Sequence, residues 1–414
     1  MGTNRILLFI VSLICSINTY SNKNVTSNTV TRTAVYEINN ALTGWYTDTW
    51  ATSVTTVKNE IYSVYVKDDL IPHVCKTDSK GNTTDIELES NYKCDNDGHN
   101  EFIIAVDKKG YIHVMGNMHN NTLRYWRSKK AYSITDGFER HFGDIPGEFT
   151  YYYFRKSQKD ELFMCCRASA KIPWYGEGSR GVGLFKYDCE SKKWEACGAI
   201  AETCQRPVIY WEPSLSYHMY KSDIRFDKKD RLHFTVLSET KDGEKTMSHA
   251  VYAYSDDYGK TWKRADGTKL SLPMNTHNTD IIKCLESKGQ ATKGAIAEHT
   301  SILLDNKNRP AVVYSTNEGT FYSYLDKGKW INETLVPGIR LQRPETLFNK
   351  DAMYIIDSFQ SDRVWKLNEY GKPAKCINLG INKTRWDHEA WEMGIIRCIY
   401  WNKSKWSIYT ISGL

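Results

Sequence analysis

Two histidine–asparagine pairs, whose side chains could move protons and bind polar ligands, stand close together in the first third of the chain. They are His99–Asn100 and His119–Asn120. Imidazole is the side chain that changes its charge most readily near neutral pH, and an amide offers both hydrogen-bond donors and an acceptor. If the two pairs lie together, they form a polar site suited to acid–base chemistry. The alternative is that each histidine caps a turn or fills a polar gap.

The segment between the two pairs predicts a β-hairpin that would bring them together. Residues 102–106 and 111–115 are short, apolar and β-prone, and the turn at 107–110 ends in glycine. A hairpin carries the residues before its first strand and after its second strand to the same end. We therefore expect His99 and His119 to meet at one rim of the structure.

A phrase within that hairpin returns twice and indicates the fold. VDKKGYIHV begins at Val106, FDKKDRLHF at Phe226 and LDNKNRPAV at Leu304. We interpret the distance along the chain from the first phrase to the second as three units of about 40 residues, and the distance from the second to the third as two such units. A repeat of this length is typical of β-propellers. The sequence thus predicts an all-β protein, a β-propeller of six or seven blades with seven favoured. A β-sandwich with coincidental turns is the alternative.

The segment SDDYGKTW, which begins at Ser255, fits the Asp-box pattern S-x-D-x-G-x-T-W. Its aspartate can bond the amides of the turn, its glycine permits a tight bend, and its tryptophan packs beneath. The pattern is typical of propeller hairpins. It is a structural device and does not indicate an activity.

The start of the chain predicts export. Arg5 precedes an apolar run at residues 6–17 and a small polar stretch, which together describe a signal peptide over residues 1–21. The run is too short to span a bilayer comfortably, so we expect no membrane association. The remainder, residues 22–414, is expected to be a single β-propeller catalytic domain, secreted and extracellular, and a monomer.

Ten cysteines follow the predicted signal peptide, and an even number in an exported chain favours disulfides. Cys189 could close a short loop with Cys197 or Cys204. The adjacent Cys165 and Cys166 could instead contribute a thiolate to a structural zinc site, and a structural calcium ion is also conceivable.

Six N-glycosylation sequons are present, so we expect a glycoprotein. One of them is Asn120, where a glycan would block the predicted rim. Either this sequon carries no glycan or the predicted site is wrong.

The chain of 414 residues has a formal net charge of +6 and a pI near 8.5. This mild positive charge suits an acidic substrate without requiring one. No lysine- or arginine-rich tract of the nucleic-acid-binding type is present, so we do not expect a nucleic acid partner.

A tyrosine and an arginine occur across a further predicted hairpin. A strand, a turn and a second strand separate Tyr151 from Arg167. They could therefore share a rim in the same way as the two histidines, although tyrosine is abundant here and a single such pair is weak evidence.

The order of these motifs resembles the propeller polysaccharide lyases of the ulvan lyase type. It runs H-N, the D-x-x-G hairpin, H-N, Thr150-Tyr151, Arg167, a Gly/Ser-rich turn at 176–181 and the Asp box, and covers about residues 97–262. The resemblance implies catalytic roles for His99, His119, Tyr151 and Arg167, and substrate contacts from Asn100 and Asn120. It also implies a second tyrosine that contacts the substrate, for which we choose Tyr220 with Tyr210 as the alternative, beside a stretch that is expanded and cysteine-rich in this chain.

The resemblance further implies β-elimination on an anionic polysaccharide that contains uronic acid and can carry sulfate groups. Arg167 would neutralise the carboxylate so that the C5 proton becomes acidic enough to leave. His99 or Tyr151 would remove that proton, His119 would bind or polarise the carboxylate, and a tyrosine would protonate the leaving O4. This scheme requires no metal and no cofactor.

Two other functions are consistent with a propeller. A non-catalytic carbohydrate-binding propeller would need the fold and an aromatic rim but not the joint presence of His99, Tyr151 and Arg167. A sialidase-type glycoside hydrolase would need three convergent arginines, a Tyr-Glu pair and an early Arg-Ile-Pro-like motif. No such motif precedes the first repeated hairpin.

Overall fold

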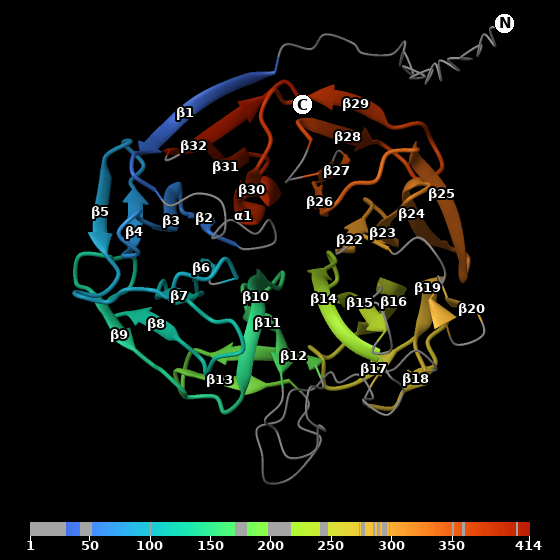
Figure 1. Ribbon diagram of the computed structural model, residues 1–414, viewed down its shortest axis with the longest axis horizontal. Coiled ribbons are helices and arrows are strands. Elements are labelled where there is room, and N and C mark those ends of the chain that lie inside the picture. The colour runs from blue at the N-terminus through green and yellow to red at the C-terminus, as the bar shows by residue number, and fades with distance from the viewer. Residues whose placement is uncertain are drawn as a thin grey trace, which may run out of the picture.

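Seven small antiparallel sheets stand in a ring in the computed structural model, which is therefore a seven-bladed β-propeller (Figure 1). The structure describes residues 30–41, 52–99, 101–169, 180–197, 217–240, 247–272, 274, 278–284, 286–287, 290–291, 296–297, 299–349, 352–357, 361–402 and 405–414. The predicted signal peptide, Asn100 and Tyr210 lie outside these residues. So does Cys204.

Each blade is a sheet whose first strand in the chain lies nearest the centre of the ring. Blade 7 differs because its outermost strand comes from the start of the chain and its other strands come from the end. Blade 1 consists of β2 (Val54–Val57), β3 (Glu60–Val66), β4 (Pro72–Thr77) and β5 (Thr83–Glu87). Blade 2 consists of β6 (Phe102–Val106), β7 (Ile112–Gly116), β8 (Tyr125–Ser128) and β9 (Phe138–Arg140). Blade 3 consists of β10 (Glu148–Lys156), β11 (Leu162–Ser169), β12 (Arg180–Asp188) and β13 (Lys193–Ala196).

Blade 4 is the largest sheet. It consists of β14 (Tyr217–Phe226), β15 (Leu232–Thr240), β16 (Met247–Ser255), β17 (Trp262–Lys263), β18 (Lys269–Leu270) and β19 (Asp280–Cys284), and a small hairpin of β20 (Glu286–Ser287) and β21 (Gln290–Ala291) follows. Blade 5 consists of β22 (Ser301–Leu304), β23 (Pro310–Thr316), β24 (Gly319–Asp326) and β25 (Lys329–Pro337). Blade 6 consists of β26 (Pro344–Phe348), β27 (Met353–Asp357), β28 (Arg363–Leu367) and β29 (Lys375–Asn378).

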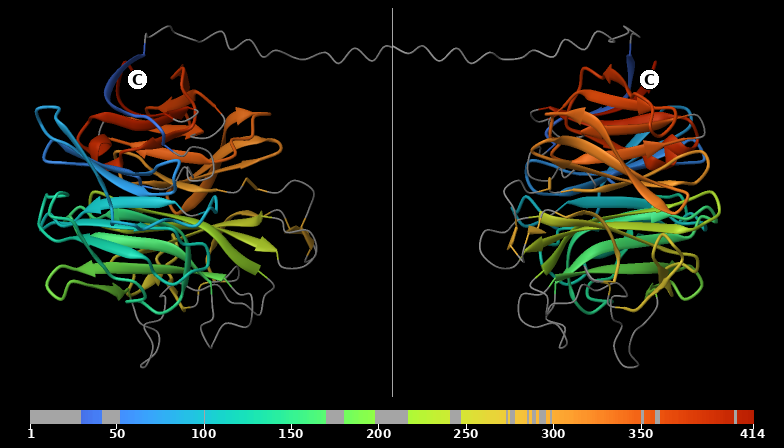
Figure 2. Two further views of the ribbon diagram at one scale, coloured as in Figure 1. Left: turned by 60° about the vertical axis from the view of Figure 1, so that its left-hand side comes forward. Right: turned by 90° about the vertical axis from the view of Figure 1, so that its right-hand side faces the viewer.

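Blade 7 closes the ring. It consists of β30 (Thr384–Trp386), β31 (Ile396–Asn402), β32 (Lys405–Ser412) and, as its outermost strand, β1 (Thr31–Ile38) from the start of the chain. The side views place β1 beside the C-terminus (Figure 2). The helix α1 (His388–Glu392) follows β30 and lies toward the centre of the ring. Closing the ring in this way pairs the two chain ends and ties the first strand to the last.

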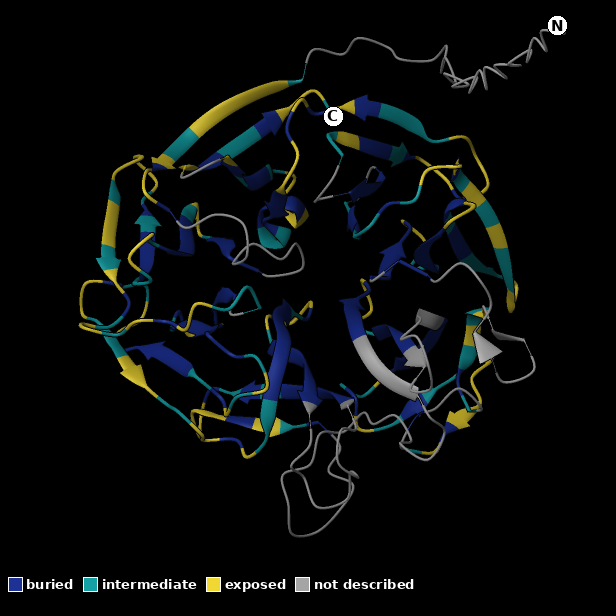
Figure 3. Ribbon diagram, viewed as in Figure 1, coloured by how far each residue is buried: buried dark blue, intermediate teal, exposed yellow. Residues whose placement is uncertain are grey.

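The core is divided among the interfaces between neighbouring blades. Blade 1 and blade 2, for example, share one apolar cluster in which Val64 and Val74 pack with Ile104 and Trp126. The inner strand β6 is buried throughout, whereas the outer strand β1 is largely exposed (Figure 3). Fully burying a large apolar side chain contributes about 1.5–3 kcal/mol, so each blade is stabilised chiefly by the blade beside it.

The three repeated hairpins are confirmed as β6–β7, β14–β15 and β22–β23, and they share one turn. The carboxylate of Asp107 accepts hydrogen bonds from the backbone N–H groups of Lys109 and Tyr111, both at 2.9 Å. Asp227 and Asp305 bind the amides two and four residues later in the same way. The aspartate therefore recurs because it satisfies the donors of a tight turn.

The repeat length inferred from these hairpins is wrong. They belong to blades 2, 4 and 5, so the two separations between them span two blades and one blade rather than three units and two. Blades are longer than the expected unit because the connections between strands are long and uneven. The chain from Ala196 to Tyr217, for instance, links β13 to β14.

The Asp box forms the predicted turn between β16 and β17. The carboxylate of Asp257 accepts hydrogen bonds from the Thr261 N–H at 2.8 Å and the Thr261 hydroxyl at 2.7 Å. Gly259 has a φ of +88°, and a Cβ there would lie 2.9 Å from a Leu184 methyl group. Trp262 is completely buried and donates its indole N–H to the Gly259 carbonyl. The motif fastens a hairpin, as expected.

No disulfide joins the nine cysteines in the described part of the chain, so the disulfide prediction is not met there. Cys189 and Cys197 are both buried as free thiols. Cys165 and Cys166, being neighbours on β11, belong to different interblade clusters; Cys165 lies 3.4 Å from the Ser222 hydroxyl and Cys166 donates to the Gly183 carbonyl. Successive residues of a strand point to opposite faces, so these two thiols face different neighbouring blades.

Among the described residues, α1 is the only α-helix, and no helix there is long and apolar enough to cross a membrane.

Candidate active site

The hairpin of blade 2 brings the two histidines into contact. Phe102, at the start of β6, pairs with Gly116, at the end of β7, so the flanking segments leave the same end of the hairpin. The rings of His99 and His119 stack with their centroids 3.9 Å apart and their planes 19° from parallel. The two imidazoles therefore form one unit.

One carboxylate binds both imidazoles. Asp97 Oδ1 lies 2.7 Å from His99 Nδ1, and Asp97 Oδ2 lies 2.8 Å from His119 Nδ1. The His99 backbone N–H also donates to Asp97, at 2.9 Å. Burial alone would raise the pKa of Asp97, but the hydrogen bonds from His99 and His119 outweigh it and lower the pKa to about 2. Asp97 is therefore an ionised acceptor at neutral pH.

Asp97, His99 and His119 also form a group that could hold a metal ion. Their potential ligand atoms lie within 4.8 Å of one another, and no other such group occurs in the described part of the chain. The lone pair of an imidazole nitrogen lies in the plane of its ring. Two nearly parallel, stacked rings direct these lone pairs side by side rather than toward one point. A carboxylate, whose two oxygens also lie side by side, can accept one N–H from each ring. The arrangement fits two hydrogen bonds and not one shared ion.

Tyr151 lies beside the histidines in a strained backbone position. Its φ is +52°, and the register of β10 with β11 shifts between Thr150 and Tyr153, which marks a β-bulge. A non-glycine residue with positive φ costs about 1–3 kcal/mol and is enriched at functional sites. The ring centroid of Tyr151 lies 6.1 Å from that of His99. The bulge thus re-aims the tyrosine within the inner strand.

Two cations face the ring of Tyr151. The guanidinium carbon of Arg167 lies 4.5 Å from the ring centroid, and Lys221 Nζ lies 4.8 Å from it. Arg167 comes from β11 and Lys221 from β14, so blades 3 and 4 both contribute. Cations at such distances are attracted to an aromatic face.

Asn120 ties the histidine loop to blade 3. Its side-chain oxygen accepts hydrogen bonds from the Arg167 guanidinium at 3.2 Å and from the Thr150 hydroxyl at 3.1 Å. Its backbone N–H in turn donates to the Thr150 hydroxyl oxygen at 2.8 Å. Asn120 has a φ of +58°, a left-handed conformation that asparagine tolerates better than most residues. It therefore positions Arg167 within the cluster.

The structure thus brings together His99, His119, Tyr151, Arg167 and Asn120, five of the residues that the sequence singles out. Asn100 lies outside the described residues. Tyr220 is placed on β14, next to Lys221, but only its backbone is described. We call Asp97, His99, His119, Tyr151, Arg167 and Lys221 the site cluster.

Asp97 and Lys221 are members that the motif comparison missed. Asp97 stands two residues before His99, which is a detectable signal for a carboxylate that orients an imidazole. Lys221 adjoins the residue assigned as the second tyrosine, and no pattern marks it. Lys221 joins the site through a contact between segments that are distant in the sequence.

The site cluster has an accessible layer and a covered layer. The side chains of His99 and His119 are 39% and 30% exposed, whereas Tyr151 and Arg167 are 7% and 3% exposed as residues. A ligand arriving from solvent therefore meets the imidazoles first. The tyrosine and the cations lie beneath them.

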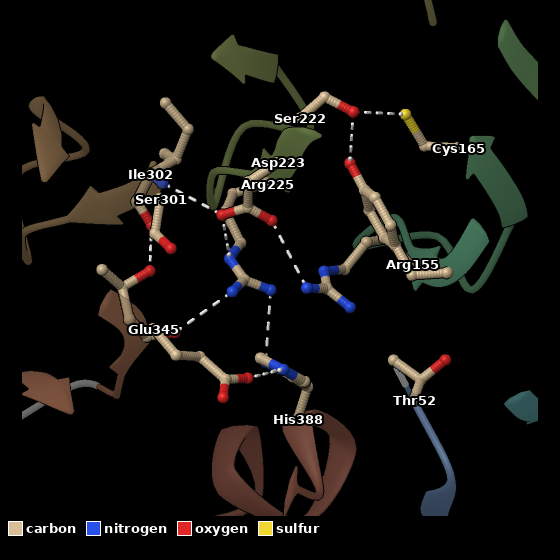
Figure 4. Close-up of polar contacts among 12 residues, drawn as sticks. Thr52, Arg155, Cys165, Ser222, Asp223, Arg225, Ser301, Ile302, Glu345 and His388 are labelled. Carbon is tan, nitrogen blue, oxygen red and sulfur yellow. Dashed lines mark hydrogen bonds and ion pairs between the residues drawn. The ribbon is translucent and has the colours of Figure 1, made fainter. Parts of the chain in front are cut away.

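A second set of charged residues lies where the inner strands end, beside α1 (Figure 4). Arg155 on β10 and Arg225 on β14 both bind the Asp223 carboxylate, each at 3.3 Å. Arg225 also donates to His388 Nδ1 at 3.2 Å, and His388 Nε2 lies 3.0 Å from a Glu345 carboxylate oxygen. We call Arg155, Asp223, Arg225, Glu345 and His388 the helix cluster. It links blades 3, 4, 6 and 7.

Burial dominates the electrostatics of the helix cluster. It lowers the pKa of Arg225 to about 10, and the neighbouring charge of Arg155 adds to the effect. Burial, followed by the charges of Arg155 and Arg225, also holds the pKa of His388 well below its usual value. His388 is consequently neutral, accepting from Arg225 and donating to Glu345.

The fold and the site cluster together define a seven-bladed propeller with a histidine–tyrosine–arginine rim. Residues 46–336 match the BNR repeat-containing family, and the chain belongs to that family. No curated protein sequence matches the chain significantly.

Solved structures with the same fold include polysaccharide lyases. The structure of polysaccharide lyase Uly1 has a TM-score of 0.64 and 16% sequence identity, covering 90% of this chain and 92% of that one. A PL25 ulvan lyase bound to -[GlcA(1-4)Rha3S]- has a TM-score of 0.65 and 11% identity, covering 91% and 96%. At these identities the likeness establishes a shared fold.

Proposed function

We propose that this protein is a polysaccharide lyase that cleaves a uronic-acid-containing glycan by β-elimination. The observation that carries the proposal is the convergence of two imidazoles, one tyrosine and two cations from blades 2, 3 and 4 on one place. This set contains the two functions that the reaction needs, which are a cation for the carboxylate and a base for the C5 proton.

The carboxylate must be neutralised before the reaction can proceed. The C5 proton of a uronate is weakly acidic because removing it adds negative charge next to a carboxylate. Arg167 provides a permanently charged fork that matches a carboxylate, and Lys221 provides a second positive charge nearby. Stabilising the charge that develops in the transition state is commonly the largest contribution to catalysis.

The elimination then moves one proton and one electron pair. A base removes the C5 proton, the C5–H electrons form the C4–C5 double bond, and the C4–O4 bond breaks. O4 leaves with the electron pair and takes up a proton from an acid. Either His99 or Tyr151 is proposed as the base, and their ring centroids lie 6.1 Å apart.

The substrate is proposed to be an extracellular anionic polysaccharide that alternates a uronate with another sugar. This rests on the PL25 ulvan lyase, whose bound ligand is a glucuronate linked to a 3-sulfated rhamnose. The positive net charge of this chain is consistent with such a ligand. Export through the predicted signal peptide would place the enzyme with that substrate.

The test is an assay of the purified protein on ulvan, glucuronan, heparan, chondroitin and rhamnose–glucuronate glycans, following the ultraviolet absorbance of the unsaturated uronate product. Arg167→Ala and His99→Ala are expected to abolish the signal, whereas Arg363→Ala, a change at an exposed arginine of β28, should leave it intact. Binding of a glycan without any absorbance change would favour a carbohydrate-binding propeller instead. Activity that survives both site substitutions would refute this assignment of residues.

A further inference from the structure

We propose that Asp97 is a positioning residue that fixes His99 and His119 in the same tautomer, so that both present a free Nε2 lone pair to the substrate. The inference rests on the proposed function for its catalytic consequence, but its structural part stands on geometry alone. Each oxygen of one carboxylate takes one imidazole, at 2.7 and 2.8 Å.

The tautomer follows from the chemistry of the acceptor. An ionised carboxylate has no proton to donate, so each Nδ1 that bonds to Asp97 must carry a hydrogen. A neutral imidazole carries only one hydrogen, which leaves Nε2 as the basic nitrogen in both rings. A carboxylate behind an imidazole holds its orientation and stabilises the imidazolium that forms when the ring accepts a proton.

Stacking makes the two histidines act together. The two rings stack with their centroids 3.9 Å apart, so displacing one ring displaces the other. One shared carboxylate holds both rings and supplies the one negative charge beside them. The cluster is therefore polarised, with Asp97 beside the histidines and with Arg167 and Lys221 against Tyr151.

Bonding to the backbone makes Asp97 a rigid anchor. Its Oδ1 accepts the His99 backbone N–H at 2.9 Å in addition to the His99 ring. This local turn fixes the carboxylate relative to the chain that carries His99. The carboxylate thereby also determines where His119, which follows the second strand of the hairpin, can lie.

The first experiment needs no substrate. Protein labelled with ¹⁵N in its histidines is examined by long-range ¹H–¹⁵N spectroscopy, with His99→Gln and His119→Gln used to assign the two signals. We expect both rings to be Nδ1–H tautomers in the parent protein. In Asp97→Asn, the amide can donate to a ring nitrogen, so at least one histidine should change to the Nε2–H tautomer.

A matched control lies two residues away. Asp95 binds Arg124 at 2.9 Å and has an exposed side chain, so Asp95→Asn should leave both tautomers unchanged. Nε2–H tautomers in the parent, or unchanged tautomers in Asp97→Asn, would overturn the proposal. Stoichiometric Zn²⁺ displacing both Nδ1 protons would overturn it in favour of a metal site.

The second experiment measures the consequence for catalysis. If the protein is a lyase, Asp97→Asn should lower kcat by about 10²-fold or more while KM changes little, because general-base catalysis is typically worth about 10²–10⁴-fold. Asp97→Glu, which keeps the charge, should recover part of the loss. A raised KM with an unchanged kcat would show that Asp97 only assists binding. Absence of activity in the parent would refute the proposed function, and the spectra would still decide the tautomer.

Discussion

The site cluster and the helix cluster are built on the same two inner strands, yet their side chains are arranged differently. β10 carries Tyr151 in one and Arg155 in the other, and β14 carries Lys221 in one and Arg225 in the other. In the helix cluster, arginines bind the Asp223 carboxylate. In the site cluster, a guanidinium and an ammonium lie against an aromatic ring.

The helix cluster is arranged as a buried structural network, whereas the site cluster is arranged as the proposed active site requires. The helix cluster joins four blades through buried ion pairs, and Asp223 also accepts the Ile302 N–H at 3.0 Å from a fifth. The site cluster has exposed imidazoles and a tyrosine in a strained conformation. Strain of this kind persists only where the surrounding structure supports it, and the ring scaffold supplies that support.

The largest expected effect is on stability at the helix cluster. Arg225→Ala should reduce the free energy of unfolding by about 3–5 kcal/mol, because it removes one partner of a buried ion pair. Denaturant unfolding measures the change, with Arg363→Ala as the exposed control. A loss below about 1 kcal/mol, the range of an exposed ion pair, would show that the cluster does not stabilise the packing of the blades.

The next effect is on activity at the site cluster. Arg167→Ala should lower kcat by about 10²–10³-fold, as expected for loss of one group that stabilises developing negative charge. Its thermal unfolding should change less than that of Arg225→Ala. Equal losses of stability in the two variants would erase the contrast between the clusters.

A smaller effect on activity is expected at Lys221. Lys221→Met keeps most of the buried side-chain volume but removes the charge beside Tyr151. We expect kcat to fall by about tenfold, corresponding to about 1.4 kcal/mol, because Arg167 remains. Steady-state kinetics on the preferred glycan give the result, and an unchanged kcat would exclude Lys221 from the chemistry.

A further effect concerns the pH dependence of stability at the helix region. Burial raises the pKa of Glu389 on α1 from its ordinary value of 4.5 to about 7. The native state then binds this proton more tightly than the unfolded state, so this residue's contribution to stability declines as pH rises from 4.5 to about 7. Glu389→Gln should remove that decline, flattening the Tm profile by a few degrees. Identical pH profiles for parent and variant would contradict this assignment.

The sequence predicts the local devices of the fold well. The aspartate turns and the Asp box are confirmed because each depends on a few adjacent residues bonding their own turn. The blade count of seven is also confirmed, whereas the inferred repeat length is wrong, because the connections between strands differ in length. The placement of β1 in blade 7 depends on contacts between the two chain ends, which no local pattern reveals.

The candidate site is only partly readable from the sequence. Hairpin geometry correctly places His99 beside His119, since both positions depend on one turn. The place of Lys221 beside Tyr151 depends on the bulge at Tyr151 and on the packing of blade 3 against blade 4. Such details follow from tertiary contacts rather than from spacing.

The most direct test of the central claim is mass spectrometry of the products formed from a uronic-acid-containing glycan such as ulvan. We predict oligosaccharides with an unsaturated uronate at the non-reducing end, each lighter by one water than the corresponding hydrolysis product, and none with Arg167→Ala. Saturated products of hydrolysis, or unsaturated products made equally well by Arg167→Ala, would contradict the account.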